Sequence, residues 1–176
     1  MSAQFWDSLS PQEQIALREV ARPRSFSPRQ PLLNEGDDSD HVLLITAGWA
    51  KVISTTEDGH QMVMGVRGPG DLVGEDAALA AVPRPATVWT LSPVRALAIP
   101  FARFLAFLDA HPAAWRTLTT TQIHRLAEAE RRIKWQASGL DATQRLALLL
   151  TELAELSTVH APPHPDGSID IAPPLS

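Results

Sequence analysis

The residues with the clearest chemical potential lie in one short segment, from Gly74 to Val88. The stretch from Glu75 to Ala80 is helix-forming and long enough for one or two turns, and the first N–H groups of a helix suit an anion. Arg84 opens the next predicted strand, so its guanidinium can return to the helix start and hold a phosphate through two parallel hydrogen bonds. Glu75 then lies within reach of hydroxyl groups attached to that phosphate, and Gly74 lets the backbone approach closely. The segment predicts a site for a hydroxyl-bearing phosphate ester.

Composition excludes several other kinds of protein. The chain has 176 residues and no cysteine, which excludes a disulfide framework, a thiolate zinc site and a cysteine nucleophile. Its 15 basic and 20 acidic residues give a net charge of −5, whereas nucleic-acid-binding domains usually carry a basic excess. The N-terminus has no signal-peptide pattern, and no apolar run approaches the ~18 residues of a membrane span. We therefore expect a cytoplasmic protein without a membrane partner.

The elements that position this segment are short strands. Strand-like runs alternate with turn signals such as Asp58-Gly59, and many short strands at this spacing predict a sandwich or barrel. The strands are expected at residues 41–46, 49–55, 61–66, 86–91 and 94–99.

Helices flank the strands on both sides. A short helix is expected between Phe5 and Val20, with Ser10 as N-cap and Pro11 in the first position. Further helices are expected at residues 101–108, 112–139 and 141–156. In the long helix, two series recur every seven residues and form the a and d positions of a heptad: Ile123, Glu130 and Ala137, and Thr119, Leu126, Ile133 and Leu140. A two-helix seam is the prediction, and packing along the protein's own sheet is the alternative.

The predicted phosphate site resembles a known family. Residues 74–88 follow the pattern Gly-Glu-x-Ala-x-Leu-x-x-x-Pro-Arg-x-Ala-Thr-Val, which is similar to the phosphate-binding cassette of cyclic nucleotide-binding domains. The turns at residues 33–37 and 45–48, the approach at 70–75, the long helix and the motifs at 141–147 and 164–167 resemble the bacterial Crp/Fnr (catabolite-activator) regulators. The resemblance implies a mainly β fold with α elements, a cyclic nucleotide-binding jelly-roll β-barrel flanked by helices and followed by a long dimerisation helix.

The resemblance also assigns roles to individual residues. It implies that Glu75 holds the ribose 2′-hydroxyl and Arg84 the cyclic phosphate, that Gly74 allows close approach, and that Glu130 faces the purine. Backbone N–H groups around three alanines would help to bind the phosphate: Ala77, Ala78 and Ala86. The implied effector is a cyclic nucleotide, with cyclic AMP ahead of cyclic GMP on family frequency, and no other cofactor is implied.

The resemblance further predicts the domain organisation and partners. Residues 1–110 would form the cyclic nucleotide-binding β-roll, 111–140 the dimerisation helix, and 141–176 the start of a winged-helix DNA-binding domain, cut short before its recognition helix. The chain is expected to form a homodimer through the long helix. DNA would be a partner only of an intact form with the complete helix-turn-helix.

Three positions leave a second hypothesis open. Pro85 lacks the N–H that the family usually offers after the arginine, Asp76 replaces an apolar residue, and Glu130 replaces a hydroxyl-bearing base contact. The alternative is a ligand-independent regulator or protein-interaction module with a degenerate nucleotide pocket.

The remaining chemistry-bearing residues indicate neither catalysis nor a metal. His60 has no second histidine at a metal-ligand spacing, so a cupin-type metal enzyme on the same architecture is remote, and we expect no catalytic residues and no metal ligands. The basic residues Arg125, Arg131, Arg132 and Lys134 alternate with glutamates, a pattern typical of a solvated helix face.

Overall fold

The computed structural model describes residues 4–38, 40–56 and 58–137, and after these residues 141, 143, 144, 146–148, 150 and 151. Backbone contacts divide the chain into two compact units, Met1–Ala129 and Glu130–Ser176. The first unit holds all the strands of the described residues and the candidate site.

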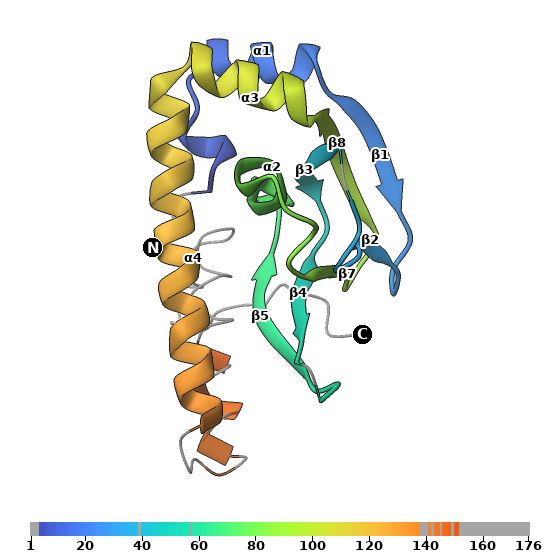
Figure 1. The fold of residues 1–176 in the computed structure, drawn as a ribbon, viewed down its shortest axis with the longest axis vertical. Coiled ribbons are helices and arrows are strands. Elements are labelled where there is room, and N and C mark those ends of the chain that lie inside the picture. The colour runs from blue at the N-terminus through green and yellow to red at the C-terminus, as the bar shows by residue number, and fades with distance from the viewer. Residues whose placement is uncertain are drawn as a thin grey trace, which may run out of the picture. The chain divides into compact units, whose positions relative to one another are not determined.

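Eight strands of the first unit form two antiparallel sheets of four strands each, a jelly-roll arrangement (Figure 1). One sheet has the order β1-β8-β3-β6, with strands β1 (Arg22–Phe26), β8 (Val94–Pro100), β3 (His41–Ala47) and β6 (Leu72–Val73). The other has the order β2-β7-β4-β5, with strands β2 (Pro31–Leu33), β7 (Thr87–Thr90), β4 (Ala50–Thr55) and β5 (Gln61–Arg67).

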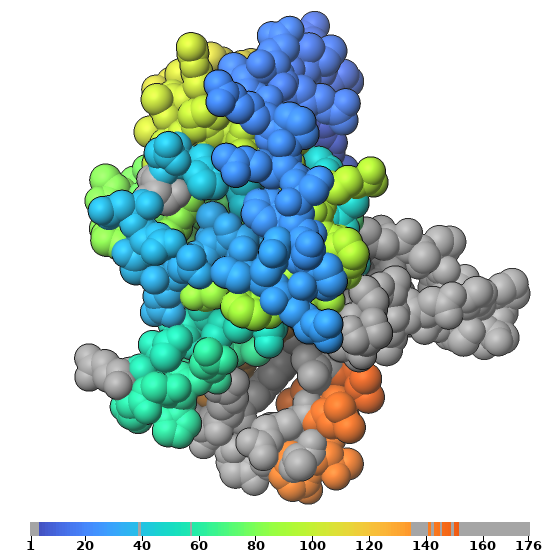
Figure 2. All heavy atoms as spheres, turned by 90° about the vertical axis from the view of Figure 1, so that its right-hand side faces the viewer, coloured from blue at the N-terminus to red at the C-terminus, as the bar shows by residue number. Residues whose placement is uncertain are grey.

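Strand β3 is buried on both of its faces, because it lies between two hydrophobic clusters. Leu43 and Ile45 point into the cluster between the two sheets, whereas Val42 and Leu44 pack against the helices. This explains the continuous apolar run in β3, where a half-exposed strand would alternate. Strand β1 is the opposite case: four of its five residues are exposed, and its blue atoms cover part of the face shown in Figure 2.

Helices pack against one end of the β-roll (Figure 1). The helices of the described residues are the 3₁₀ turn η1 (Trp6–Ser8), α1 (Pro11–Glu19), α2 (Glu75–Ala80), α3 (Phe101–Ala110) and α4 (Pro112–Ala137). Ser10 and Glu13 form a reciprocal capping box at the start of α1, as expected for Ser10 as N-cap. Helices α1 and α3 lie side by side, and Phe104 and Leu108 of α3 bury their side chains in the helix-side cluster (Figure 1).

The structure confirms the predicted fold class, a jelly-roll β-barrel flanked by helices and followed by a long helix. It differs from the sequence prediction at the N-terminus, where η1 and α1 replace one helix because Ser10 and Pro11 begin a new one. The sequence did not predict β1, β2 or β6; the last two are only three and two residues long.

Two further predictions concern residues beyond the first unit. Half of the expected helix at residues 141–156 and the whole motif at residues 164–167 lie outside the described residues. Within the described part of the chain, no helix is both long enough and apolar enough to cross a bilayer. The division into residues 1–110, 111–140 and 141–176 stays a prediction.

Candidate functional site

Helix α2 begins at Gly74, which has the left-handed conformation, with φ of +84°. A Cβ at this position would overlap Nη1 of Arg84 and approach Leu33 to 2.9 Å. Two constraints therefore require glycine here: the backbone angle and the guanidinium packed against it. The sequence predicted a close approach at Gly74, and the structure shows that the closest neighbour is the site's own arginine.

Arg84 lies almost fully buried, with 2% of its surface exposed. Its Nη1 donates a hydrogen bond to the backbone carbonyl of Gly74 at 2.7 Å, and its Nη2 donates one to the carbonyl of His41. The guanidinium also lies 5.3 Å from the centre of the Phe101 ring. Burial lowers the pKa of Arg84, and the carboxylates of Glu75, Asp40 and Asp37 oppose that shift. These contacts hold a cation at the first turn of α2.

Glu75, the first residue of α2, is equally buried at 2% exposure. Its Oε1 accepts hydrogen bonds from Nη1 of Arg125 and, at 3.1 Å, from Nε2 of Gln122, both on α4. Its Oε2 is buried without a hydrogen-bond partner among the described residues. Desolvation raises the pKa of Glu75, although the guanidinium of Arg125 favours the charged form. A buried carboxylate oxygen without a donor is costly, so Oε2 is suited to accept a hydroxyl hydrogen from a ligand.

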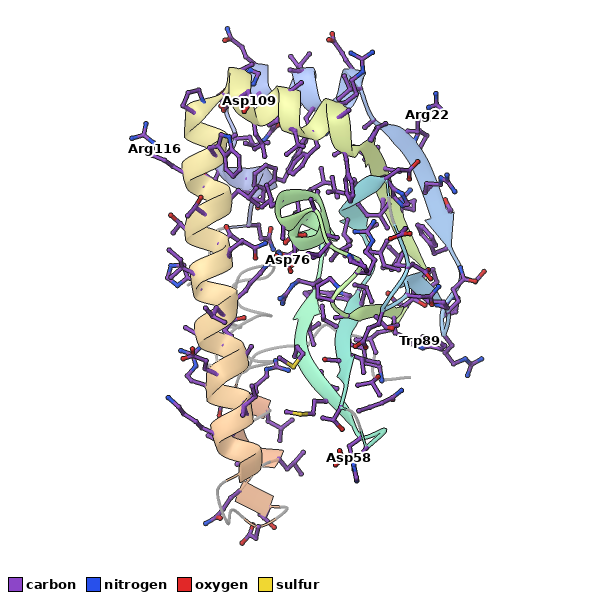
Figure 3. The ribbon with its side chains drawn as sticks, viewed as in Figure 1. Arg22, Asp58, Asp76, Trp89, Asp109 and Arg116 are labelled. Atoms are coloured by element: carbon purple, nitrogen blue, oxygen red, sulfur yellow. The ribbon has the colours of Figure 1, made fainter. Side chains whose placement is uncertain are left out.

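Two aspartates extend this contact between the roll and α4. Asp76, labelled in Figure 3 at the start of α2, accepts a hydrogen bond from Nε2 of Gln122 at 2.6 Å. Asp71, in the turn before β6, accepts one from Nη2 of Arg125 at 3.1 Å. Desolvation acts to lower the pKa of Arg125, but the carboxylates of Glu75 and Asp71 outweigh it and raise that pKa. Arg125 is therefore charged, and it pairs with one carboxylate just before β6 in the chain, Asp71, and one just after it, Glu75.

A third arginine, Arg67, lies at the end of β5. Its Nη1 donates a hydrogen bond to the carbonyl of Val66 at 2.9 Å, and its guanidinium lies over Gly65. Burial lowers the pKa of Arg67 to about 10, with the positive charge of Arg125 acting in the same direction. Within the described ranges, no carboxylate forms an ion pair with this side chain.

These side chains surround a cavity of about 430 Å³, a size typical of small-molecule sites. Its walls come from strands β2, β4, β5, β6 and β7, from α2 and the loop after it, and from α4. The charged and amide side chains at the cavity are Arg67, Glu75, Asp76, Arg84, Gln122 and Arg125. The apolar ones include Leu33, Val52, Met64, Leu72, Val88 and Leu126. An apolar chamber with a few polar groups at its margin can hold a flat heterocycle and an anion together.

Comparison with known families decides the identity of this fold. A family model described as the cyclic nucleotide-binding domain matches residues 23–111, which include the whole candidate phosphate site except the α4 side chains. The chain belongs to the cyclic nucleotide-binding domain family. The segment 74–88 lies within the residues that the family model matches.

Relatives of this cyclic nucleotide-binding domain include Crp-like regulators. The chain is 23% identical over 153 residues to the CRP-like cAMP-activated global transcriptional regulator of Mycobacterium tuberculosis, covering 87% of this chain and 68% of that protein. The Thermus thermophilus catabolite activator protein superposes with a TM-score of 0.66 at 22% identity, covering 77% of this chain and 63% of its own. The c-di-GMP responsive global regulator CLP of Xanthomonas campestris superposes with a TM-score of 0.72 at 22% identity. The match covers 90% of this chain and 78% of CLP. The chain thus spans less than two thirds of the Thermus protein.

The cassette residues predicted from the sequence are only partly at the cavity. Gly74, Glu75, Arg84 and Ala86 line it. Ala77 and Ala78 are buried within α2, with 2% and 8% exposure, and are not among the lining residues. Glu130 belongs to the second unit, where its side chain is exposed, and its role at the purine stays a prediction, as do the ligand roles of the others.

The cyclic nucleotide-binding site also contains residues that the sequence did not reveal. Arg125 was predicted to be on a solvated helix face; that interpretation is wrong, because its side chain is 11% exposed and paired with Glu75 and Asp71. Helical periodicity could have indicated that Arg125 faces the roll. The buried residues Ala114 and Leu118 define the inner face of α4, and steps of three or four residues from them lead to Gln122 and Arg125. Arg67 had no comparable signal, since it ends a strand of mixed pattern.

Proposed function

We propose that this chain is the ligand-sensing and dimerisation part of a Crp/Fnr-type transcription regulator, and that a cyclic nucleotide binds in the cavity between the cassette and α4. The observation that supports this most strongly is the buried Oε2 of Glu75, which has no hydrogen-bond partner in the described part of the chain, beside the buried guanidinium of Arg84. The pair offers one acceptor for a ribose 2′-hydroxyl and one cation for a phosphate, and a cyclic nucleotide carries both groups on one rigid ring.

The phosphate would bind at the first turn of α2, where Arg84 is already held in position by Gly74 and His41. A positioned guanidinium loses little side-chain entropy on binding, and a charge-assisted hydrogen bond contributes about 1.5–3 kcal/mol. Pro85 removes one N–H next to this arginine, so the phosphate depends more strongly on Arg84 itself.

Ligand binding at this site would be coupled to the position of α4 through Glu75. Oε1 of Glu75 accepts hydrogen bonds from Arg125 and Gln122, so a ligand hydroxyl at Oε2 changes the charge distribution on the carboxylate that holds α4. A ligand shifts an equilibrium between two helix arrangements only by its differential affinity for them. In this mechanism that difference arises at the Glu75–Arg125 contact, and the helix transmits it to the residues that follow.

The partner expected at α4 is a second copy of the chain. Ile123 and Leu126 are each 63% exposed, and Ile133 in the second unit is 44% exposed. All three occupy the predicted heptad positions, and large apolar residues exposed at that spacing are typical of a two-helix seam. DNA would be the partner of an intact regulator in the cytoplasm, with the complete helix-turn-helix.

Titration calorimetry tests the ligand. The wild-type chain should bind a cyclic purine nucleotide at one site per chain, and Arg84→Ala should lose most of that affinity while keeping its fold. Heat from neither cyclic AMP nor cyclic GMP would remove the ligand proposal and leave the fold intact. The family resemblance ranks cyclic AMP first, and the choice of base depends on the cavity residues.

One observation favours the second candidate, a ligand-independent regulator or interaction module. Arg125 and Gln122 already hold Oε1 of Glu75, and Asp76 adds a further carboxylate to the contact, so α4 is attached to the cassette without any ligand. Under this candidate, an intact regulator would bind DNA with the same affinity with and without added nucleotide.

A further inference from the structure

Two side chains of α4 hold Glu75, and each of them is shared with a neighbouring aspartate. Arg125 donates to Oε1 of Glu75 through Nη1 and to Oδ1 of Asp71 through Nη2, the second bond at 3.1 Å. Gln122 donates through Nε2 to the same Oε1 at 3.1 Å and to Oδ1 of Asp76 at 2.6 Å. Both donors therefore end on Oε1, while the buried Oε2 has no hydrogen-bond partner in the part of the chain that the structure describes.

This geometry of Arg125 differs from the pairing that a guanidinium and a carboxylate prefer. Their favoured pairing is bidentate, with two parallel N–H···O bonds that use both carboxylate oxygens. Here the two Nη atoms are divided between Glu75 and Asp71, so that each carboxylate receives one bond. The division leaves Oε2 of Glu75 without a bond from Arg125, at the point where a ribose hydroxyl is proposed to bind.

The turn before β6 fixes Asp71 independently of Arg125. Oδ2 of Asp71 accepts a hydrogen bond from the backbone N–H of Gly68 at 2.9 Å, and the backbone N–H of Asp71 donates to the carbonyl of Gly68 at 3.1 Å. The carbonyl of Asp71 accepts a hydrogen bond from the N–H of Ile45 on β3 at 2.9 Å. Since Oδ2 is engaged within the turn, Oδ1 is left to face α4, and Asp71 is a fixed acceptor for Arg125.

The contact is enclosed, so the partners of Arg125 cannot be exchanged for bulk water without cost. The exposed fractions of the three side chains are 2% for Glu75, 11% for Arg125 and 20% for Asp71. A guanidinium that loses one carboxylate in such a place needs another acceptor for the N–H group that is released. Oε2 belongs to the carboxylate that Arg125 already holds, and it lacks a donor. Loss of Asp71 therefore favours a bidentate pair between Arg125 and Glu75.

We propose that Asp71 is a positioning residue of the nucleotide site: by holding one arm of the Arg125 guanidinium, it keeps Oε2 of Glu75 open to a ribose 2′-hydroxyl. This inference rests on the proposed function, because it takes the ribose to bind at Glu75. Without Asp71, Arg125 closes on both oxygens of Glu75, and the ligand loses its acceptor. Asp71 acts on the ligand only through Arg125, since it is not among the residues that line the cavity.

The test compares the affinities of cyclic AMP and 2′-deoxy cyclic AMP for the full chain, measured by calorimetric titration. The two ligands differ only in the hydroxyl that Oε2 is proposed to bind, so the ratio of their affinities reports on that contact. We expect a ratio of about ten in wild type. In Asp71→Asn the ratio should fall to about one, because cyclic AMP binds about tenfold more weakly. Asparagine suits the test, because its amide oxygen can still accept from Gly68 while its NH₂ group faces Arg125.

A second substitution tests whether the effect passes through the guanidinium. Lysine presents a single nitrogen, which cannot form two parallel bonds to one carboxylate. Arg125→Lys and the Asp71→Asn/Arg125→Lys double variant should therefore both keep a ratio of about ten.

An aspartate outside the cavity provides the matched control. Asp109→Asn removes the same charge from an exposed position on α3, at the helical end of the roll in Figure 3, and should leave the ratio at its wild-type value. Far-ultraviolet circular dichroism and thermal unfolding check that each variant is folded.

The outcomes separate this inference from the proposed function. A wild-type preference for cyclic AMP that Asp71→Asn leaves unchanged, even if both ligands bind more weakly, overturns the role of Asp71 while nucleotide binding at Glu75 stands. A preference that is lost in Asp71→Asn and not restored in the double variant also overturns it, because the effect then does not pass through Arg125. Equal affinity of wild type for the two ligands, or binding of neither, overturns the proposed contact at Glu75 and this inference together.

Discussion

Arg125 on α4 donates a hydrogen bond to Oε1 of Glu75 at the start of α2, and the two side chains expose only 11% and 2% of their surface. The pair joins the cassette to the long helix, with Asp71 as a second carboxylate for the arginine at 3.1 Å. Removing one partner of a buried pair leaves the other charge uncompensated, which costs more free energy than the pair contributes when intact.

Arg125→Met should therefore destabilise the chain by about 3–5 kcal/mol, because Glu75 and Asp71 lose their buried counter-charge. Urea unfolding followed by circular dichroism measures the change. Arg125→Lys is the matched control, and its free energy of unfolding should decrease less, because lysine keeps the positive charge. A Glu75→Gln/Arg125→Met double variant should recover part of the loss. If Arg125→Met unfolds at the wild-type midpoint, the pair has no structural role.

The pH dependence of stability should depend on Glu75. Burial raises the pKa of this carboxyl above the ordinary glutamate value of about 4.3, so the native state binds more protons than the unfolded state as the pH rises from that value. The free energy of unfolding then decreases with pH in that window. Glu75→Gln removes this contribution, so its melting temperature relative to wild type should increase from pH 4.5 to pH 7. A difference in melting temperature between the two proteins that stays constant across this pH range would contradict the raised pKa of Glu75.

Gly74→Ala should disturb both the backbone and Arg84. An alanine at φ of +84° costs about 1–2 kcal/mol, and its Cβ would also overlap Nη1 of Arg84. Gly36→Ala is a close control, because Gly36 has φ of +81° and open space around its Cβ. We expect both variants to lose stability but only Gly74→Ala to lose nucleotide affinity. Equal affinity in the two variants would show that Arg84 tolerates the displacement.

Charge on the exposed face of α4 should prevent dimerisation. Ile123→Glu and Leu126→Glu each place a carboxylate at a predicted seam position that is 63% exposed. Light scattering at micromolar concentration should give twice the chain mass of 19.1 kDa for wild type and a value near 19.1 kDa for the double variant. Thr120→Glu, exposed but outside the heptad positions, is the control. A wild-type monomer would contradict the seam.

The fold and the cassette could be predicted because their signals are local. Short apolar runs and turn dipeptides predicted five of the eight strands found among the described residues, and the spacing from Gly74 to Arg84 predicted that the two residues act together. The structure goes further on this last point. The carbonyl of Gly74 accepts a hydrogen bond from the side chain of Arg84, a contact across ten residues.

The other half of the site depends on tertiary packing. Asp71, Gln122 and Arg125 meet only because α4 packs its inner face against the roll, some 50 residues after the cassette in the chain. A basic residue in a helix with many glutamates has the same local pattern whether it is solvated or buried, which is why Arg125 was misinterpreted. Arg67 is similar, because its guanidinium packs in the space that a side chain at position 65 would occupy, which the local pattern of β5 does not reveal.

The central claim is that the buried Oε2 of Glu75 and the guanidinium of Arg84 together bind the ribose phosphate of a cyclic nucleotide. Calorimetric titration of the wild-type chain with cyclic AMP tests the site as a whole, and titration with the 2′-deoxy analogue tests the contact at Oε2. We expect one site per chain for cyclic AMP, and an affinity for the analogue that is about tenfold lower, because the analogue leaves Oε2 without a donor. Equal affinity for the two compounds, or no heat from either, would contradict the claim.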